Sequence, residues 1–277
     1  MKTVQTEKIA LHSFLWLAVI IIIFPILFTF LTSLKHLVDI ITGALVFKPT
    51  LANYAQLFVG YRSSFTQLTI NSLVIGTLTA VIVLCVSSFG AYSLTRLGWH
   101  PLPSGIILGW TLFVHMLPPI TFIGPFYLIS RSLGIYDSIL AVVMAHVVLN
   151  LPLAIWMLQS FFESVPKELE EAAAIDGCNQ FRTFWQVVLP ITRPGIAATA
   201  LLVFIFSWKD FLFALTLTST PRGMTIPVGI ASFAQEWSVR YGEMSAASFF
   251  ATIPAILLVV FAQRHIVKGM TLGALKG

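Results

Sequence analysis

Six long apolar segments govern what this chain can fold into. Each has about 20 residues or more, the length that an α-helix needs to cross a bilayer, and none shows the alternating ten-residue pattern of a membrane β-barrel. Hydrophobic residues make up 57% of the chain and charged residues 10%, far from the usage of soluble domains. The sequence therefore predicts an all-α membrane protein, a single bundle of six transmembrane helices. The segments are residues 11–34, 66–95, 104–129, 138–162, 195–217 and 244–263.

Basic residues predict the orientation of these segments. An even number of spans places both termini on one side, together with residues 163–193. Nine of the sixteen lysines and arginines fall on that side and six on the other, with Lys209 inside a span. Because these residues are retained in the cytoplasm, we expect cytoplasmic termini and an uncleaved first span that serves as an anchor. The same retained charge explains the net charge of +5 without a nucleic-acid partner.

Several kinds of chemistry have no motif in this sequence. It lacks the GxxxxGK[ST] phosphate loop, the HExxH zinc motif and the GxSxG nucleophile motif. Cys85 in the second span and Cys178 in the predicted cytoplasmic loop lie in different environments, which does not favour a disulfide or a metal site. We therefore predict a chain that is not an enzyme and holds no metal or cofactor. If ATP drives it, another subunit supplies the ATPase.

The loop 163–193 is the most acidic part of the chain, with five of its eleven acidic residues. Pro166 favours the start of a helix, and the pair Asp176-Gly177 favours its end, because glycine readily adopts the left-handed conformation that terminates helices. A second helix should follow, up to the Leu-Pro pair at residues 189–190, with an apolar face at i, i+3, i+4 and i+7. The residues of that face are Phe181, Phe184, Trp185 and Val188. The sequence of this loop thus predicts a helix, a turn and a second helix.

The spacing in this loop resembles the EAA signature of bacterial ABC importer permeases. In that signature, EAA is followed by a glycine, nine residues, an aliphatic residue (here Val187), one further residue and Leu-Pro. The resemblance implies that the loop contains the coupling helix, which sits in a groove of a cytoplasmic ATPase and relays its closure to the bundle. It assigns this role to Glu168, Glu170, Glu171, Ala172, Ala173, Asp176, Gly177, Leu189 and Pro190. From periodicity alone, an ordinary amphipathic surface loop fits equally well.

Two other regions resemble one subgroup of these permeases. Residues 206–211 and 263–277 are similar to those of carbohydrate-importer permeases, a group that includes the smaller permease of the maltose transporter. This implies a type I importer permease in a bacterial inner membrane, with a second, homologous permease as heterodimer partner. It also implies two ATPase subunits that bind ATP and Mg, and an extracytoplasmic sugar-binding protein. A disaccharide or glycosylated polyol, such as trehalose or glucosylglycerol, is the expected substrate.

Charged and aromatic residues of the fifth segment are candidates for the transport pathway. Lys209 and Asp210 lie within an apolar run, where a charge costs on the order of 2.5–3.5 kcal/mol unless it is paired or wetted. We expect at least one to line the pathway, with Trp208 stacking on a sugar ring. Alternatively, both charges pair with polar residues of neighbouring helices such as His115 or Asn150, and Trp208 is a packing residue.

Prolines and polar residues mark the other spans. His115 precedes Pro118-Pro119, so the third segment should be kinked, and such breaks often border a membrane binding site. The sequence Asn150-Leu151-Pro152 predicts a break in the fourth segment. Asn71 in the second segment completes the set of pathway candidates.

Two other functions compete with an importer. An ion-coupled secondary carrier would use Lys209, Asp210 and His115 for coupling and need no ATPase. A structural membrane scaffold would show no substrate-dependent effect of changes at Trp208 or Lys209. The complete EAA spacing favours the importer.

Overall fold

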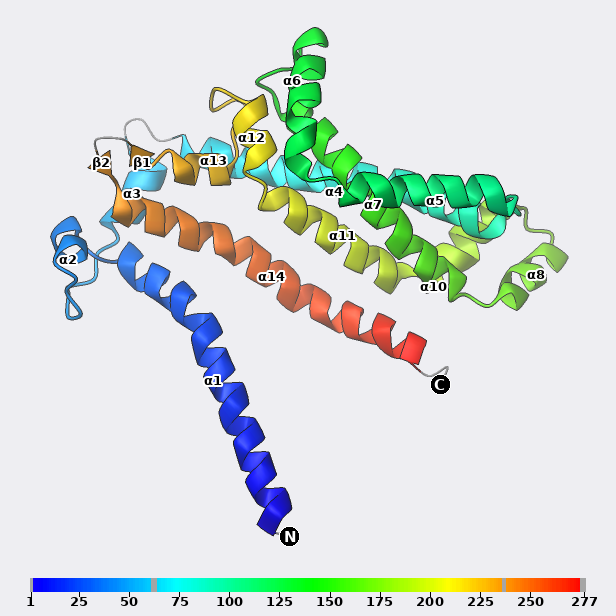
Figure 1. Cartoon of the computed structure of the whole chain (residues 1–277), viewed down its shortest axis with the longest axis horizontal. Helices are drawn as coiled ribbons and strands as arrows, with labels where there is room; N and C mark the ends of the chain where they lie inside the picture. The colour runs from blue at the N-terminus through cyan, green and yellow to red at the C-terminus, as the bar shows by residue number, and fades with distance from the viewer. Residues whose placement is uncertain (1, 61–63, 236–237, 275–277) are drawn as a thin grey trace. The chain divides into compact units, whose positions relative to one another are not determined.

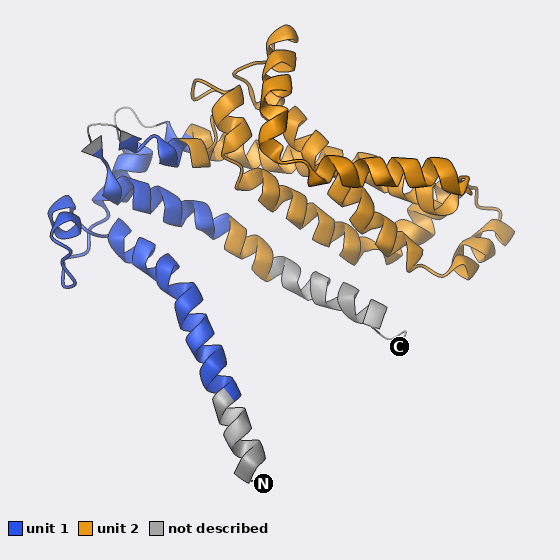
Figure 2. Ribbon diagram, in the orientation of Figure 1, with its two compact units in different colours: residues 1–66, 229–254 blue, residues 67–228, 255–277 orange. Residues whose placement is uncertain are grey.

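The computed structural model describes residues 2–60, 64–235 and 238–274, and the side chains within residues 11–60, 64–234 and 239–260. The described chain is helical except for one short two-stranded hairpin, which confirms the all-α prediction (Figure 1). It divides into two compact units, one of residues 1–66 with 229–254 and the other of residues 67–228 with 255–277 (Figure 2).

Four of the described helices are each long and apolar enough to cross a membrane. They are α1 (Lys2–Ser33), α4 (Phe65–Arg96), α7 (Ile139–Glu163) and α14 (Tyr241–Ala274). Two further helix pairs meet the same criteria jointly but bend sharply at a short break, which gives up to six spans if each pair counts as one. Within the apolar part of α1, Leu11–Ser33, Ser33 at the end is the one residue that is buried within this chain, and the exposure of the others suits contact with lipid.

The third predicted segment is broken where its prolines predict a kink, and that prediction is confirmed. Helix α5 (Pro101–Met116) ends before Pro118, and the 3-10 turn η1 (Pro119–Phe122) leads into α6 (Ile123–Ser132). The two halves are bent by 99°. A proline disfavours helical geometry in the residue before it, and Leu117 accordingly has an extended ψ of 135°.

The fourth and fifth segments differ from the sequence prediction. Helix α7 continues through Pro152, so the predicted break there is wrong. Membrane helices tolerate proline where neighbouring helices support them, and α7 packs against both α5 and α11 (Arg193–Trp208). The fifth segment breaks instead, at residues 209–211, before α12 (Leu212–Leu217) begins.

The first unit joins the end of α1 to the start of α14. Ser33 Oγ lies 2.7 Å from the Tyr54 hydroxyl, and Asn53 Nδ2 donates to the backbone oxygens of Ser33 and Lys35 at 2.8 and 3.0 Å. Gly242 of α14 permits a close approach, because a Cβ there would lie 2.4 Å from Asn53 Oδ1. The unit also holds α2 (Leu37–Ile41), α3 (Ala52–Val59) and the antiparallel strands β1 (Ala234–Gln235) and β2 (Ser238–Val239).

The second unit is built around α7. Helices α5 and α11 pack along it, and α6 and α12 join its apolar core (Figure 1). The contact of α11 with α7 requires a glycine, because a Cβ at Gly195 would lie 2.3 Å from Cγ of Phe161. Helix α13 (Ile226–Ala231) follows the loop after α12. Large core residues that are almost fully buried are Ile75, Val142, Phe213 and Leu217.

A second apolar cluster lies where α4, α7 and the acidic loop meet. Its centre is Phe184, whose ring centroid lies 4.9 Å from that of Tyr92 and 6.1 Å from that of Phe162. The cluster also contains Ala91, Leu158, Val165 and Val188. Through these contacts the acidic loop packs against the ends of α4 and α7.

Candidate functional site

The acidic loop forms the predicted helix, turn and helix. Helix α8 (Lys167–Ile175) begins directly after Pro166. It ends at Ile175, and Gly177, two residues later, has a φ of +83°. The N–H groups of Gly177 and Cys178 donate to the carbonyls of Ala174 and Ala173 at 3.0 and 2.9 Å. This pair of bonds is a Schellman motif, in which a left-handed glycine satisfies the last carbonyls of the helix.

The second helix is less regular than its periodicity predicts. Asn179 caps α9 (Gln180–Thr183) by accepting the N–H of Arg182 at 2.9 Å, a cap that the sequence interpretation missed although asparagine is a favoured N-cap residue. A π-helical turn, η2 (Phe184–Val188), and then α10 (Leu189–Ile191) continue the chain, so the helix extends one residue beyond Pro190. Leu189 packs on the apolar cluster under the loop, and Pro190 occupies the first turn of α10.

The predicted apolar face of this second helix is only half buried. Phe184 and Val188 are inside the cluster, whereas Phe181 and Trp185 are 64% and 47% exposed. A π-helical turn closes over five residues, so Phe181 before it and Trp185 within it do not share the face of Phe184 and Val188 that a regular α-helix would give them. The two exposed aromatic rings therefore remain available to lipid or to another subunit.

One face of α8 is open to solvent in this chain. All residues of α8 except Glu170 and Ala173 are exposed, and on the side of the helix opposite these two the exposed residues recur at i, i+3, i+4, i+7 and i+8. We call this surface the exposed stripe of α8; its members are Glu168, Glu171, Ala172, Ile175 and Asp176. Ile175 is 87% exposed and was not among the predicted site residues. Ala173, which was, is buried.

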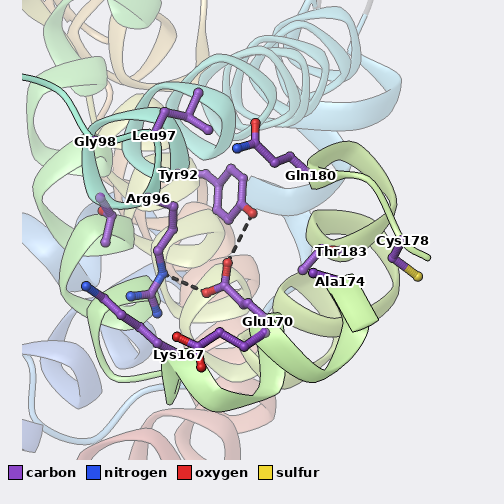
Figure 3. Close-up of a pocket in the computed structure, with 12 residues that line it drawn as sticks. Tyr92, Arg96, Leu97, Gly98, Lys167, Glu170, Ala174, Cys178, Gln180 and Thr183 are labelled. Carbon is purple, nitrogen blue, oxygen red and sulfur yellow. Dashed lines mark hydrogen bonds and ion pairs between the residues drawn. The ribbon is translucent and has the colours of Figure 1, made fainter. Parts of the chain in front are cut away.

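Glu170 points inward from α8 instead. Its Oε1 lies 2.7 Å from Arg96 Nε, and its Oε2 accepts a hydrogen bond from the Tyr92 hydroxyl at 3.2 Å. Figure 3 shows both α4 side chains converging on this carboxylate. Beside them lies a pocket of about 350 Å³, whose lining includes Lys167 and Cys178. No sequence pattern links Arg96 or Tyr92 to the loop, since more than 70 residues separate them from Glu170.

The charged pair of the fifth segment lies at the break between α11 and α12. Asp210 Oδ2 lies 3.1 Å from Nε2 of the buried His146 of α7, and accepts the backbone N–H groups of Phe213 and Ala214 at the start of α12. The partner of Asp210 is therefore His146, and not His115 or Asn150 as the sequence interpretation suggested. Lys209 is exposed, with its Nζ 4.8 Å from the centroid of the Phe206 ring.

The other pathway candidates are spread over the unit. Trp208 is buried, and its ring stacks on Phe204 at 5.8 Å, an arrangement that the packing alternative explains. His115 is exposed on α5. Among the described residues, no hydrogen bond or ion pair joins His115 or Asn71 to the charges of the fifth segment.

Asn71 and Asp137 anchor the loop that follows α12. The Asn71 side chain is fully buried, and its Nδ2 lies 2.8 to 3.2 Å from the carbonyl oxygens of Pro221, Arg222 and Met224. Asp137, before α7, accepts the N–H groups of Ser219 and Thr220 and the Thr220 hydroxyl. Burial opposes ionisation of Asp137, but these hydrogen bonds and the Arg222 charge outweigh it and lower its pKa below the ordinary 3.8. Asn71 thus has a positioning role in this structure.

Comparison with known proteins identifies the family. A family described as "Binding-protein-dependent transport system inner membrane component" matches residues 93–272, more than half of the chain. The trehalose transport system permease protein SugB of Mycobacterium tuberculosis is 36% identical over 91% of this chain and 92% of its own length. The trehalose/maltose transport system permease protein MalG of Thermococcus litoralis is 34% identical over 94% of both chains.

Solved structures agree with the fold. A bacterial ABC transporter involved in import of the acidic polysaccharide alginate superposes with a TM-score of 0.76 at 21% identity, covering 95% of this chain and 98% of that one. The same transporter type in complex with an alginate-bound periplasmic protein gives a TM-score of 0.70 at 14% identity, over 93% and 94% of the two chains. The acidic loop lies inside the matched family region. The chain belongs to the binding-protein-dependent transport system inner membrane components, the integral membrane permeases of ABC transporters.

Proposed function

We propose that this chain forms half of the translocation pathway of an ATP-driven sugar importer. The observation that carries the proposal is the exposed stripe of α8: a helix terminated by a Schellman glycine presents Glu171 and Ala172 of the EAA signature outward, beside Ile175. An exposed isoleucine rimmed by carboxylates suits a protein partner better than solvent. The whole chain, residues 1–277, acts as one permease domain.

The importer needs partners of the kind its relatives have. A second, homologous permease completes the pathway as a heterodimer, two cytoplasmic ATPase subunits bind ATP and Mg, and an extracytoplasmic binding protein delivers the sugar. The structure of a relative with a periplasmic protein supports the last of these. The excess of lysine and arginine on the side of the termini and the acidic loop supports a cytoplasmic position for both.

In the proposed mechanism this chain performs no covalent chemistry. ATP binding closes the ATPases, α8 and the helix after it move with them, and the bundle rocks from inward-open to outward-open to receive the sugar. Hydrolysis then resets the assembly. The bends at residues 117–119 and at the start of α11 are the places where rigid helices of this chain join, and such breaks absorb hinge motion.

A disaccharide or glycosylated polyol is the substrate class that we propose. Three relatives support it: they are named as permeases for trehalose, for trehalose and maltose, and, in Agrobacterium fabrum, for sulfoquinovosyl glycerol, the last 34% identical over 92% of this chain. Lys209 and His115 are the pathway candidates of this chain that are exposed, and Lys209 offers donors to sugar hydroxyls.

Charge reversal on the exposed stripe tests the proposal. The chain and its partner subunits are reconstituted in liposomes, and uptake of labelled trehalose is measured with ATP inside. Glu171→Lys should lower uptake and ATPase association at least about tenfold, since a like charge in a complementary interface costs several kcal/mol. Glu163→Lys is the matched control, because Glu163 is exposed in the same segment but lies outside α8.

Two outcomes would contradict the proposal. Wild-type uptake by Glu171→Lys would show that ATPase docking does not use the stripe. Uptake that requires no ATP and collapses with a protonophore would identify an ion-coupled secondary carrier instead.

A further inference from the structure

Arg96 of α4 contacts both Glu170 of α8 and the end of α7. Arg96 Nε, at the end of α4, lies 2.7 Å from Glu170 Oε1, and the Tyr92 hydroxyl donates to Oε2 at 3.2 Å (Figure 3). Arg96 Nη2 also donates to the backbone oxygens of Phe162 and Val165, at 2.8 and 2.5 Å, where α7 ends. A single guanidinium thus joins the ends of α4 and α7 to the helix that carries the exposed stripe.

The geometry makes this connection stiff. The side chains of Arg96 and Glu170 are 8% and 15% exposed, so solvent and salt screen their attraction far less than that of a surface pair. The carbonyls at the end of α7 carry the negative end of the helix dipole, which favours a cation there. Nη2 donates hydrogen bonds to the two carbonyl oxygens, while Nε makes an ion-pair contact with Glu170 that lacks hydrogen-bond geometry, so the guanidinium contacts both partners at once.

No other side chain of α8 shares this task. Within Lys167–Ile175, all of which the structure describes, Glu170 alone makes a side-chain hydrogen bond or ion pair, and Ala173 alone is buried. Glu168 and Glu171 lie on the exposed stripe. The acidic residues of the helix therefore have two roles: Glu168 and Glu171 form part of the exposed surface, and Glu170 contacts α4.

We propose that Arg96 is a positioning residue for transport, which holds α8 rigidly to the ends of α4 and α7 so that a displacement of α8 moves both spanning helices. The ion pair with Glu170, supported by Tyr92, is the link in this transmission. The inference rests on the proposed importer function and deepens it. Loss of the link leaves the exposed stripe intact, so the ATPase still binds and hydrolyses ATP, but hydrolysis no longer drives uptake.

The test uses the variant Arg96→Met/Glu170→Leu, which removes the pair without leaving one buried charge unpaired. The full transporter is reconstituted in liposomes, and ATP hydrolysed per sugar transported is measured. We expect ATPase subunits at wild-type stoichiometry and an ATP cost per sugar at least about fivefold higher. Glu163→Leu, the same substitution at an exposed position, should leave the ratio unchanged. A wild-type ratio in the double variant would overturn the proposal, and so would loss of the ATPase subunits, because Glu170 would then belong to the docking surface.

A second measurement does not depend on transport. In the purified full-length chain, backbone hydrogen exchange of Lys167–Ile175 should be at least about tenfold faster in the double variant, since α8 loses its fixed support, while exchange within residues 143–152 of α7, away from the Arg96 contacts, is unchanged. Tyr92→Phe, which removes only the bond to Oε2, should give a smaller increase. Unchanged exchange in the double variant would refute the link even if the chain proved to be a sugar importer. An absence of ATP-driven uptake by the wild type, with the exchange result as expected, would instead refute the importer function alone.

Discussion

Replacing Gly177 with alanine tests whether α8 must end where it does. Gly177 has a φ of +83°, and a Cβ there would meet no heavy atom within 4 Å, so the cost of alanine is that of the backbone alone. A left-handed L-residue costs roughly 1–2 kcal/mol. This cost opposes the two hydrogen bonds that end α8 and lowers the ratio of correctly terminated to unravelled or extended helix by about 5–30-fold. We expect ATP-driven uptake in proteoliposomes to fall measurably, by at most the same factor as this ratio.

Gly134 provides a matched control within the same chain. It ends α6 in the same motif: its φ is +69°, its N–H donates to the Arg131 carbonyl at 3.1 Å, and the N–H of Ile135 donates to the Ser130 carbonyl at 2.9 Å. A Cβ there also meets nothing within 4 Å. Gly134→Ala should therefore lower thermal stability in detergent as much as Gly177→Ala, while uptake falls only in the latter. Equal losses of uptake in both variants, or wild-type uptake in Gly177→Ala, would refute the reasoning.

Three further predictions concern the packing and the loop that follows α12. Asn71→Ala should destabilise the chain by about 1–3 kcal/mol and speed proteolysis within residues 221–224, because the carbonyls that Asn71 binds lose their buried donor; normal protease resistance would contradict this. Gly195→Ala should cost about 1–3 kcal/mol of stability through the clash with the Phe161 ring, and Phe161→Leu should restore part of the melting temperature. The pKa of Asp137 is lowered in the folded chain, so its stabilisation of the loop after α12 is present above the ordinary pKa of 3.8 and is lost as the pH falls through the folded pKa. Proteolysis of this loop should therefore increase only at such low pH. An increase already near pH 5 would argue against this.

Local features of the fold were accessible from the sequence because single residues carry them. Pro166 and Gly177 mark the two ends of α8 through the backbone conformations that proline and glycine favour. Pro118 likewise locates the break between α5 and α6. The continuous course of α7 through Pro152 was not predictable, since it depends on support from helices that are distant in sequence.

Pairings across the sequence account for what the sequence interpretation missed. The contact of Arg96 with Glu170 joins residues 74 positions apart, and that of His146 with Asp210 joins residues 64 apart. Hydrophobic periodicity predicts which face of a helix is apolar but not which polar residues of two helices meet. The break at residues 209–211 was also missed, because the sequence interpretation placed the charges there within one continuous apolar segment.

Purification of the full-length chain from its native membrane in mild detergent tests the central claim most directly, with ATP hydrolysis measured in the presence and absence of sugar-loaded binding protein. The account predicts that a second six-span permease and an ABC ATPase co-purify with the chain, and that the loaded binding protein stimulates ATP hydrolysis. A chain that purifies without an ATPase, under conditions that keep known ABC transporters assembled, would contradict it.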